Sequence, residues 1–404
     1  MAKSGQNNRV VSGIRPTGGT HLGNYHGALK NWVALQHEYE CYFFVADWHA
    51  LTTHYDDSAD LDNYVQEIII DWLAAGLNPN MCTMFIQSRV VEHAELHVLL
   101  SMITPLSWLE RVPTYKDQQE RLKKKDLSTF GFLGYPLLQS ADILLYRPAY
   151  VPVGADQVAH VEITREIARR FNHLYGREPG FEDKANDAVR KLGGKNAKLY
   201  QQMRRKYQEK GELEALEKGK AIVMDHASLT LADRERLLGF LEGGGRNILV
   251  EPEALLTPTP KVPGLDGQKM SKSYNNTIGL REDPDSVDKK LRTMQTDPAR
   301  VRRTDPGTPE KCPVWELHKI YSDEQTLEWV QEGCTTAGIG CIDCKKKLIE
   351  RVVSEIEEMR TRAREYEENP EFVRSIIAEG CEDARDAARD TMDEVRQAMG
   401  LDYR

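Results

Sequence analysis

The sequence has no long hydrophobic run. It never reaches the roughly eighteen consecutive apolar residues that a membrane-spanning helix needs. Its first ten residues are mostly polar and do not contain the apolar core of a secretory signal peptide. We therefore expect a cytoplasmic protein that has no membrane partner.

Cysteine and excess positive charge are also scarce. Seven cysteines in 404 residues are too few for a disulfide scaffold, which favours a reducing compartment. The net charge is −9, so the chain is not suited to indiscriminate binding of polyanions such as DNA. Contact with any nucleic acid would therefore require a local basic surface. A chain of this length is expected to form two or three domains.

Residues 9–175 alternate between strand-like and helix-like segments. The apolar run 41–46 is typical of a strand that is buried on both faces, and 83–86 and 150–153 are shorter candidates. The segment 58–75 between them has apolar residues at helical spacing. Strands that alternate with helices predict an α/β fold with a parallel sheet and crossover helices.

Two further segments have a different composition. Residues 178–248 are rich in Lys, Arg and Gln, which predicts an inserted helical segment such as a helical hairpin. Its charges are explained either by solvent exposure or by contact with RNA. Residues 282–404 are almost wholly helical in pattern. The predicted domains are 1–177 and 249–281 as two parts of one catalytic domain, 178–248 as the insertion, and 282–404 as an α-helical domain.

The glycine-rich segment 12–32 precedes an amphipathic helix. It contains Gly18, Gly19 and Gly23, with His21 and Asn24 on either side of the last glycine. A glycine turn that opens a helix presents free backbone N–H groups to a phosphate, and the helix dipole favours the negative charge. This segment predicts a phosphate site, although glycine turns are also common for purely structural reasons.

A second loop carries two lysines. Lys269 and Lys272 lie on either side of Met270 and Ser271, in a segment entered through Gly264 and Gly267. Two ammonium groups on such a loop can hold a polyphosphate that is gaining charge. The plain alternative is a solvated lysine loop.

Taken together, these motifs resemble a known family. His21-Leu22-Gly23-Asn24 and the distant Lys269-Met270-Ser271-Lys272-Ser273 are similar to the two signature motifs of class I aminoacyl-tRNA synthetases. The segments 46–52, 134–146, 151–160 and 162–172 most resemble bacterial tryptophanyl-tRNA synthetases, and only 178–248 has no counterpart.

The resemblance implies a fold, an activity and partners. It implies a Rossmann-like catalytic domain, followed by an α-helical domain that binds the tRNA anticodon. The implied activity is ATP-dependent activation of L-tryptophan and its transfer to tRNA(Trp), with Mg²⁺ accompanying the nucleotide. A homodimer is also implied. A non-catalytic RNA-binding relative is a weaker alternative, because His21, Asn24, Lys269 and Lys272 are all present.

The resemblance also assigns residues. His21, Asn24, Lys269 and Lys272 would act in catalysis. The ATP site implied by the family would comprise Arg15, Pro16, Thr17, Gly23, Asn24, Gly154, Ala155, Asp156, Val262, Lys269, Met270, Ser271, Lys272 and Ser273.

The choice of amino acid depends on a predicted helix at 134–146. An indole needs one buried acceptor at the end of an apolar slot, and Asp142 occupies the family's position for it. Tyr135 lies two turns earlier on the same face. Gln139 departs from some tryptophan enzymes, and the Tyr-Gln-Asp spacing also resembles tyrosyl-tRNA synthetases. The remaining residues assigned to the amino-acid pocket are His49, Val151, Val153 and Gln157.

Four of the seven cysteines cluster near the C-terminal end. Cys312, Cys334, Cys341 and Cys344 lie within 33 residues and include one Cys-x-x-Cys pair. Clustered thiols in a reducing compartment suggest a metal site, and both zinc and a [4Fe–4S] cluster are compatible with them. A subset of bacterial tryptophanyl-tRNA synthetases has a similar array that holds a [4Fe–4S] cluster.

Overall fold

The structure is a computed structural model, and it describes residues 8–56, 58–112, 129–256 and 261–403. Its centre is a parallel five-stranded sheet with the strand order β3–β2–β1–β4–β5. The α/β fold predicted from the sequence is confirmed. The strands are β1 (Arg9–Ile14), β2 (Glu40–Val45), β3 (Cys82–Ile86), β4 (Tyr150–Val153) and β5 (Glu253–Leu256).

Aromatic side chains attach helices to both faces of β2. Phe43 stacks on Trp32 of α2 at 4.4 Å between ring centroids, and Trp32 packs edge-on against Trp72 of α4. On the other face, Tyr42 stacks on Tyr146, which follows α8. Because successive strand residues point to opposite faces, the continuous apolar run of β2 is buried between two helical layers.

The helices of this part are α1 (Leu22–Asn24), α2 (Lys30–Leu35), α3 (Asp47–His54), α4 (Leu61–Ala75), α5 (Glu92–Ser101), α6 (Leu106–Leu109), α8 (Phe130–Leu144) and α9 (Val158–Tyr175). A π-helical turn at Tyr25–Leu29 joins α1 to α2, and short 3₁₀ turns lie at Gln87–Arg89, Ala155–Gln157, Lys272–Tyr274 and Pro309–Lys311.

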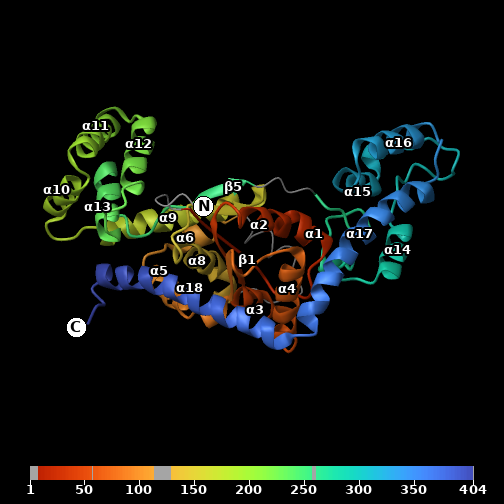
Figure 1. Cartoon of the computed structure of the whole chain (residues 1–404), viewed down its shortest axis with the longest axis horizontal. Coiled ribbons are helices and arrows are strands. Elements are labelled where there is room, and N and C mark those ends of the chain that lie inside the picture. The colour runs from red at the N-terminus through yellow and green to blue at the C-terminus, as the bar shows by residue number, and fades with distance from the viewer. Residues whose placement is uncertain (1–7, 57, 113–128, 257–260, 404) are drawn as a thin grey trace.

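Helices α10 to α13 form a unit that we call the arm. They are α10 (Phe181–Lys191), α11 (Gly194–Lys210), α12 (Leu213–Met224) and α13 (Leu231–Glu242). The arm has its own hydrophobic core, which includes Tyr200, Val223 and Leu237. It projects from one end of the molecule (Figure 1). The inserted segment is therefore helical, as predicted, but it contains more helices than a hairpin.

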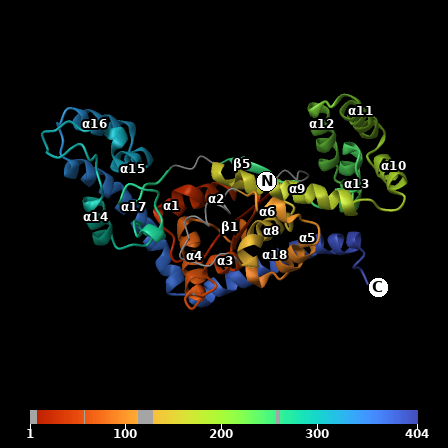
Figure 2. The ribbon, with the colours of Figure 1, turned by 180° about the vertical axis from the view of Figure 1, so that it is seen from behind.

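The C-terminal region contributes α14 (Pro284–Thr293), α15 (Pro313–Tyr321), α16 (Glu324–Thr335), α17 (Cys341–Glu367) and α18 (Pro370–Met399). Helices α14 to α16 lie at the end opposite the arm, whereas α18 runs back along the sheet and the helices packed on it in both views (Figures 1 and 2). Gly380 lets α18 approach β3, because a Cβ there would overlap the Met84 carbonyl. Residues of α17 and α18 therefore share one hydrophobic core with the sheet. No helix in the described part of the chain is both long enough and apolar enough to cross a membrane.

Candidate active site

A cavity of about 390 Å³ opens at the carboxyl ends of β1 and β4. Strand order reverses between these two strands, since β2 and β3 lie on one side of β1 and β5 lies beyond β4. Ligands of open parallel sheets bind at this kind of switch point. The residues lining the cavity include Arg15, Phe44, His49, Tyr135, Gln139, Asp142, Ile143, Val151, Val153, Gly154, Gln157 and His160.

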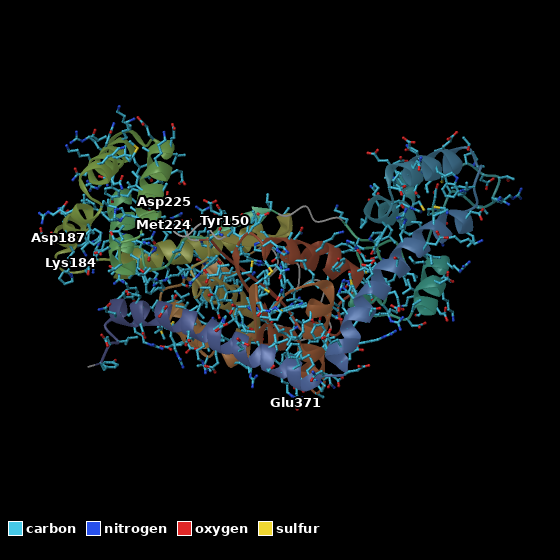
Figure 3. All side chains as sticks on the ribbon, in the orientation of Figure 1. Tyr150, Lys184, Asp187, Met224, Asp225 and Glu371 are labelled. Atoms are coloured by element: carbon cyan, nitrogen blue, oxygen red, sulfur yellow. The ribbon has the colours of Figure 1, made fainter. Side chains whose placement is uncertain are left out.

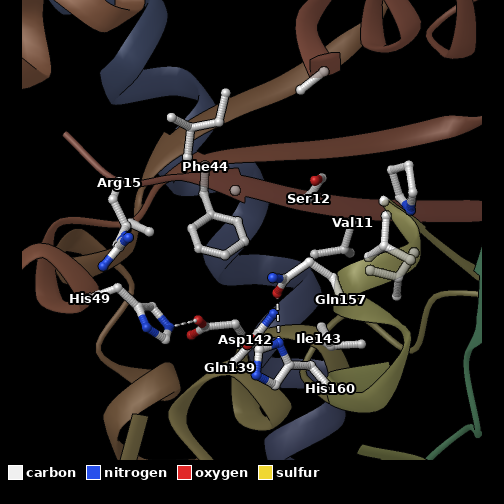
Figure 4. Close-up of a pocket in the computed structure, with 18 of the residues that line it drawn as sticks. Val11, Ser12, Arg15, Phe44, His49, Gln139, Asp142, Ile143, Gln157 and His160 are labelled. Carbon is white, nitrogen blue, oxygen red and sulfur yellow. Dashed lines mark hydrogen bonds and ion pairs between the residues drawn. The ribbon is translucent and has the colours of Figure 1, made fainter. Parts of the chain in front are cut away.

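Asp142 is the buried acid of this cavity. Its side chain is 1% exposed. It accepts hydrogen bonds at 2.7 Å from His49 Nε2, His93 Nδ1 and Gln87 Nε2 (Figure 4 shows the first). A carboxylate offers about four acceptor directions. Three protein donors therefore leave capacity for one more donor, such as an N–H group of a ligand.

The charge of Asp142 is fixed by the same contacts. Burial alone would raise the pKa of Asp142, but the hydrogen bonds from His49 and His93 outweigh it and hold the pKa well below its usual range. Asp142 is therefore a carboxylate at neutral pH. The cavity pairs this fixed anionic acceptor with apolar side chains such as Phe44, Ile143 and Val151, which suits a large, mainly apolar ligand that carries a donor.

A second polar group lines the same cavity. His160 Nδ1 donates to Gln157 Oε1 at 2.6 Å, and its Nε2 lies 3.4 Å from the Tyr135 hydroxyl (Figure 4 draws the first of these). Tyr135 and Gln139 come from α8, while Gln157 and His160 follow β4. These side chains are distant in sequence, but they meet because β4 and α9 place them beside α8.

The glycine turn lies beside this cavity. Gly18 has φ = +105°, a conformation that L side chains rarely adopt. His21 then caps α1, because its Nδ1 accepts from the Asn24 backbone N–H at 3.2 Å while Asn24 Oδ1 accepts from His21 N–H at 3.3 Å. The turn therefore ends in a capped helix start next to Gly23.

His21 is a neutral donor in this arrangement. Burial, and then the neighbouring charges of Lys272 and Lys269, lowers the pKa of His21 to about 4. Because Nδ1 accepts from Asn24, the proton of the neutral ring belongs on Nε2. The ring therefore has one N–H available for an anionic ligand.

The lysine loop reaches the glycine turn from the far end of the sequence. Lys272 Nζ donates to the Thr17 carbonyl at 3.2 Å and lies over Gly18. Burial lowers the pKa of Lys272 to about 8, although Asp71 opposes the shift. Asn276 shapes this loop, since its Oδ1 accepts from Ser271 N–H at 2.8 Å and its Nδ2 donates to Asp266 at 2.6 Å.

The structure places the other predicted residues as follows. Met270 is buried against Gly23, and its N–H donates to the Val262 carbonyl at 3.1 Å, while Lys269 is exposed. Thr17 N–H donates to the Arg15 carbonyl across Pro16 at 3.0 Å. Gly154 and Ala155 follow β4 at the cavity edge. The side chains of Asp156 and Ser273 lie outside the described residues.

The four clustered cysteines come from three places in the C-terminal region. Cys312 precedes α15, Cys334 ends α16, and Cys341 and Cys344 open α17. Burial, and then the neighbouring thiols of Cys312, Cys334 and Cys341, raises the pKa of Cys344 to about 12. Among the described residues, no group of three or more His, Cys, Asp or Glu side chains is arranged to hold a metal ion. The metal centre thus stays a prediction.

Sequence reasoning missed Gln87 and His93, which donate to Asp142, and did not single out His160, which contacts Gln157 and Tyr135. Gln87 follows β3, His93 belongs to α5, and His160 belongs to α9. No motif surrounds Gln87 and His93, and their roles depend on long-range packing. The only available signal is that parallel strands end at one edge, so that polar residues directly after β3 meet those after β1 and β2.

Comparison with known proteins places the chain in a family. The model of the tRNA synthetases class I (W and Y) matches residues 3–190 and 232–357. The tryptophan–tRNA ligase of Ralstonia nicotianae is 64% identical over 395 residues, which cover 98% of this chain and 99% of that protein. The Thermotoga maritima enzyme of the same name is 44% identical over 395 residues, covering 97% and 99%.

A solved structure agrees with these sequences. The tryptophanyl-tRNA synthetase of Campylobacter jejuni, crystallised with ADP and tryptophan, superposes with a TM-score of 0.71 at 28% identity. The match covers 97% of this chain and 99% of that one. With its Rossmann-like sheet and its cavity at the switch point, this chain belongs to the class I tRNA synthetases of the tryptophan and tyrosine group.

Proposed function

We propose that this chain is a tryptophan–tRNA ligase, which activates L-tryptophan with ATP and transfers it to tRNA(Trp). The observation that carries the proposal is the approach of Lys272 to Thr17 and Gly18 beside the cavity that contains Asp142. The ammonium group of Lys272, which would bind phosphate, thus lies beside the cavity whose acceptor is the Asp142 carboxylate. The 64% identity to a tryptophan–tRNA ligase over nearly the full length supports the same conclusion.

The first step is adenylate formation. A carboxylate oxygen of tryptophan attacks the α-phosphorus of ATP, the bond to the β-phosphate oxygen breaks, and pyrophosphate leaves. No protein nucleophile is needed, so catalysis consists of positioning and charge stabilisation. Mg²⁺ accompanies ATP as part of the substrate. In the second step, a ribose hydroxyl at the 3′ end of the tRNA attacks the adenylate carbonyl, loses its proton, and AMP leaves.

Each residue of the site has a proposed role in these steps. Asp142 accepts the indole N–H, and Tyr135, Gln139, His49, Val151, Val153 and Gln157 line the slot. Gly23, Asn24 and His21 Nε2 donate to the phosphates, while Lys269 and Lys272 balance the charge of the leaving pyrophosphate. Arg15, Pro16, Thr17, Gly154, Ala155, Asp156, Val262, Met270, Ser271 and Ser273 complete the nucleotide site.

Amino-acid-dependent exchange of pyrophosphate into ATP tests the activity directly. We expect exchange with L-tryptophan and none with L-tyrosine at the same concentration, because a phenol would leave a buried polar group unpaired. Exchange with tyrosine alone would favour the tyrosine-specific alternative and overturn the proposal. Absence of exchange with either amino acid would favour a non-catalytic protein.

The proposed function also implies how the chain is divided into domains. In our proposal, residues 1–177 and 249–281 form the catalytic domain, 178–248 the insertion, and 282–404 the domain that binds the tRNA anticodon.

An exposed apolar surface on α5, α6 and α8 further supports a homodimer. It includes Val98, Met102, Leu106 and Phe130, all at least half exposed. Contiguous apolar surfaces of this kind mark protein interfaces.

We also assign a [4Fe–4S] cluster to Cys312, Cys334, Cys341 and Cys344. The donor chemistry fits, because the thiols of Cys312, Cys334 and Cys341 are near enough to raise the pKa of Cys344. Gly307 leaves room beside Cys334, since a Cβ there would lie 2.6 Å from Cys334 Sγ. Two cations suit an anionic group there. Arg300 Nη1 lies 3.8 Å from Cys334 Sγ, and the nearby Lys345 is buried with its ammonium bonded to the Arg292 and Met294 carbonyls. The group would brace α15, α16 and α17 without taking part in the reaction.

Visible absorption of anaerobically purified protein tests the cluster. We expect a broad band in the blue that disappears in Cys341→Ser and persists in Cys381→Ser, a cysteine of α18 outside the group. A colourless protein that contains one zinc per chain would replace the cluster by zinc. A colourless protein without metal would overturn both.

A further inference from the structure

Two helices of the arm lie outside the family model, which matches residues up to 190 and again from 232, so that α11 and α12 fall wholly in the unmatched stretch. They are nevertheless well packed. Tyr200 of α11, Val223 of α12 and Leu237 of α13 are completely buried, and the Tyr200 hydroxyl donates to the Leu237 carbonyl at 2.5 Å. The arm is therefore a defined structure whose presence the proposed reaction does not explain.

The neck of the arm holds it in a fixed direction. Gly239, Gly245 and Gly176 pack backbone against backbone, since a Cβ on Gly239 would overlap the Gly245 carbonyl and one on Gly245 would meet Gly176 at 2.5 Å. Asn172 Oδ1 accepts from the N–H groups of both Ile248 and Leu249 at 2.9 Å. The junction formed by Gly176, Gly239 and Gly245 is thus close-packed.

Buried ion pairs reinforce this junction. Glu235 of α13 pairs with Arg147, which follows α8, at 2.9 Å and also with Arg246. Arg246 in turn pairs with Glu394 of α18. Both arginines and Glu235 are less than a tenth exposed. The pairs join the arm to the segment after α8 and to α18, so they fix its orientation.

The positive charge of the arm is concentrated on α11 and on the last two residues of α10. Residues 190–210 contain eight Lys or Arg and a single acid, Glu209, in a chain whose net charge is −9. The other helices of the arm carry mixed charges. Figure 3 shows one such mixture on α10, where Lys184 and Asp187 lie at the outer edge of the arm.

The basic residues of α11 divide into two sets. Arg204 turns inward, where its Nε donates to the Phe240 carbonyl at 2.7 Å and its guanidinium lies 3.7 Å from the centre of the Phe240 ring. Lys195, Lys198 and Arg205 are exposed, and helical geometry places them opposite the buried Tyr200 and Met203. Arg204 is therefore structural, whereas the exposed set is available to a partner.

Little within the protein neutralises the exposed set. Among the described residues, neither Lys195 nor Lys198 has an acidic side chain within ion-pair distance, and Arg205 approaches Glu209 only at 3.9 Å. The exposed amides of Gln201 and Gln202 lie on the same surface. Lysine, arginine and amide side chains in one row are the groups that contact phosphate and sugar in nucleic-acid complexes.

We infer that this face of α11, formed by Lys195, Lys198, Gln201, Gln202 and Arg205, binds the phosphodiester backbone of the tRNA substrate. The inference rests on the proposed function, which brings a polyanion to a protein of net negative charge. The arm stands at the opposite end of the molecule from α14 to α16 (Figure 1). The exposed basic face of α11 therefore lies beyond the catalytic domain, where it would contact backbone away from the tRNA 3′ end.

The test compares two double variants that each remove two charges from the arm. One is Lys195→Gln/Lys198→Gln on α11, and the control is Lys184→Gln on α10 with Lys218→Gln on α12. We expect the α11 variant to raise the KM for tRNA about 3- to 10-fold and to lower the salt slope of tRNA binding by about one per lysine. Tryptophan-dependent exchange of pyrophosphate into ATP needs no tRNA and should stay unchanged in both double variants.

Each other outcome overturns the inference. An unchanged KM and salt slope in the α11 variant would mean that the face binds no RNA, as expected if its partner were an acidic protein. Equal effects in the control would mean that overall charge, not this face, matters. Reduced exchange in the α11 variant would point to damage in the catalytic site. Failure of the proposed function would be distinct, because the unaltered chain would then lack tryptophan-dependent exchange.

Discussion

At the residue scale, the site depends on how one carboxylate is held. Asp142 accepts from His49, His93 and Gln87, and these contacts keep it ionised despite its burial. A buried anion surrounded by donors is rigid and cannot turn towards solvent. It can therefore recognise one N–H of a ligand by position as well as by charge.

Replacement of this acid should affect tryptophan and leave ATP binding unaltered. Because a hydrogen bond to a charged group contributes about 1.5–3 kcal/mol, Asp142→Asn should lower kcat/KM for tryptophan about 10- to 100-fold. The KM for ATP should stay within about twofold. Pyrophosphate exchange at varied tryptophan and then at varied ATP separates the two effects, and Asp187→Asn on the outer edge of the arm is the matched control. Equal losses for both substrates would contradict the role of Asp142.

Lys272 gives the site a pH dependence. Burial lowers the pKa of Lys272 to about 8, so its ammonium group is present below pH 8 and is lost as the pH rises through that value. Since kcat/KM reports the free enzyme, kcat/KM for ATP should fall above about pH 8. Lys272→Arg should move this fall to higher pH, because a guanidinium stays protonated. A profile that falls at the same pH in both proteins would show that another group is responsible.

The residues that line the cavity were easier to predict from the sequence than the residues that hold Asp142 in place. Asp142, Tyr135 and the residues after β4 could be located from spacing and resemblance because they fall in short continuous segments. Gln87 and His93 could not, since they precede Asp142 by 55 and 49 residues and reach it only through strand order and the packing of α5 on α8.

At the scale of elements, one ion-pair group joins the glycine turn to the lysine loop. Asp71 of α4 accepts from Thr20 N–H and from Arg281 Nε, both at 2.6 Å. Thr20 precedes His21, and Arg281 follows the lysine loop. Arg281 also pairs with Glu67 and with Glu367 at the end of α17. Burial alone would lower the pKa of Arg281, but Asp71 and Glu67 reverse the shift and raise it.

A double-mutant cycle can measure this coupling. Arg281→Met should destabilise the protein by about 3–5 kcal/mol, because it leaves Asp71, which is 2% exposed, as a buried unpaired charge. Adding Asp71→Asn should recover part of that loss, with a coupling free energy of about 0.5–3 kcal/mol. Denaturant unfolding of the four proteins gives the values. Additive losses would show that the pair is not coupled in the folded state.

Elements differed in how well the sequence predicted them. The strands β2, β3 and β4 could be recognised as short apolar runs between helices. Strands β1 and β5 were missed because β1 mixes polar and apolar residues and β5 is only partly buried. In the insertion, Gly193, Gly211 and Gly243 adopt positive φ, and each lies just after a helix. The amino-acid composition alone had predicted only a helical hairpin there.

At the scale of the whole molecule, the C-terminal helices have two kinds of surroundings. Helices α17 and α18 pack along the sheet and its helices, whereas α14 to α16 stand at one end of the molecule, where α14 and α15 still contribute to the same hydrophobic core. Periodicity identified these helices as amphipathic, but the partner of an apolar stripe depends on chain topology. The return of α18 beneath β3 follows from the small residue at Gly380, which no periodic pattern would single out.

The exposed apolar surface of α5, α6 and α8 leads to the last prediction. Met102 is 69% exposed and Phe130 68%, next to a hollow of about 260 Å³ lined by Trp48, His97 and Phe130. If two copies cover this surface, Met102→Glu should convert dimers into monomers, because an unpaired charge would be buried at the contact. Leu213→Glu on the arm, where Leu213 is 71% exposed, is the matched control and should leave the dimer intact. Analytical ultracentrifugation gives the masses. A monomeric unaltered chain would refute the dimer, and an undisturbed dimer in Met102→Glu would place the contact elsewhere.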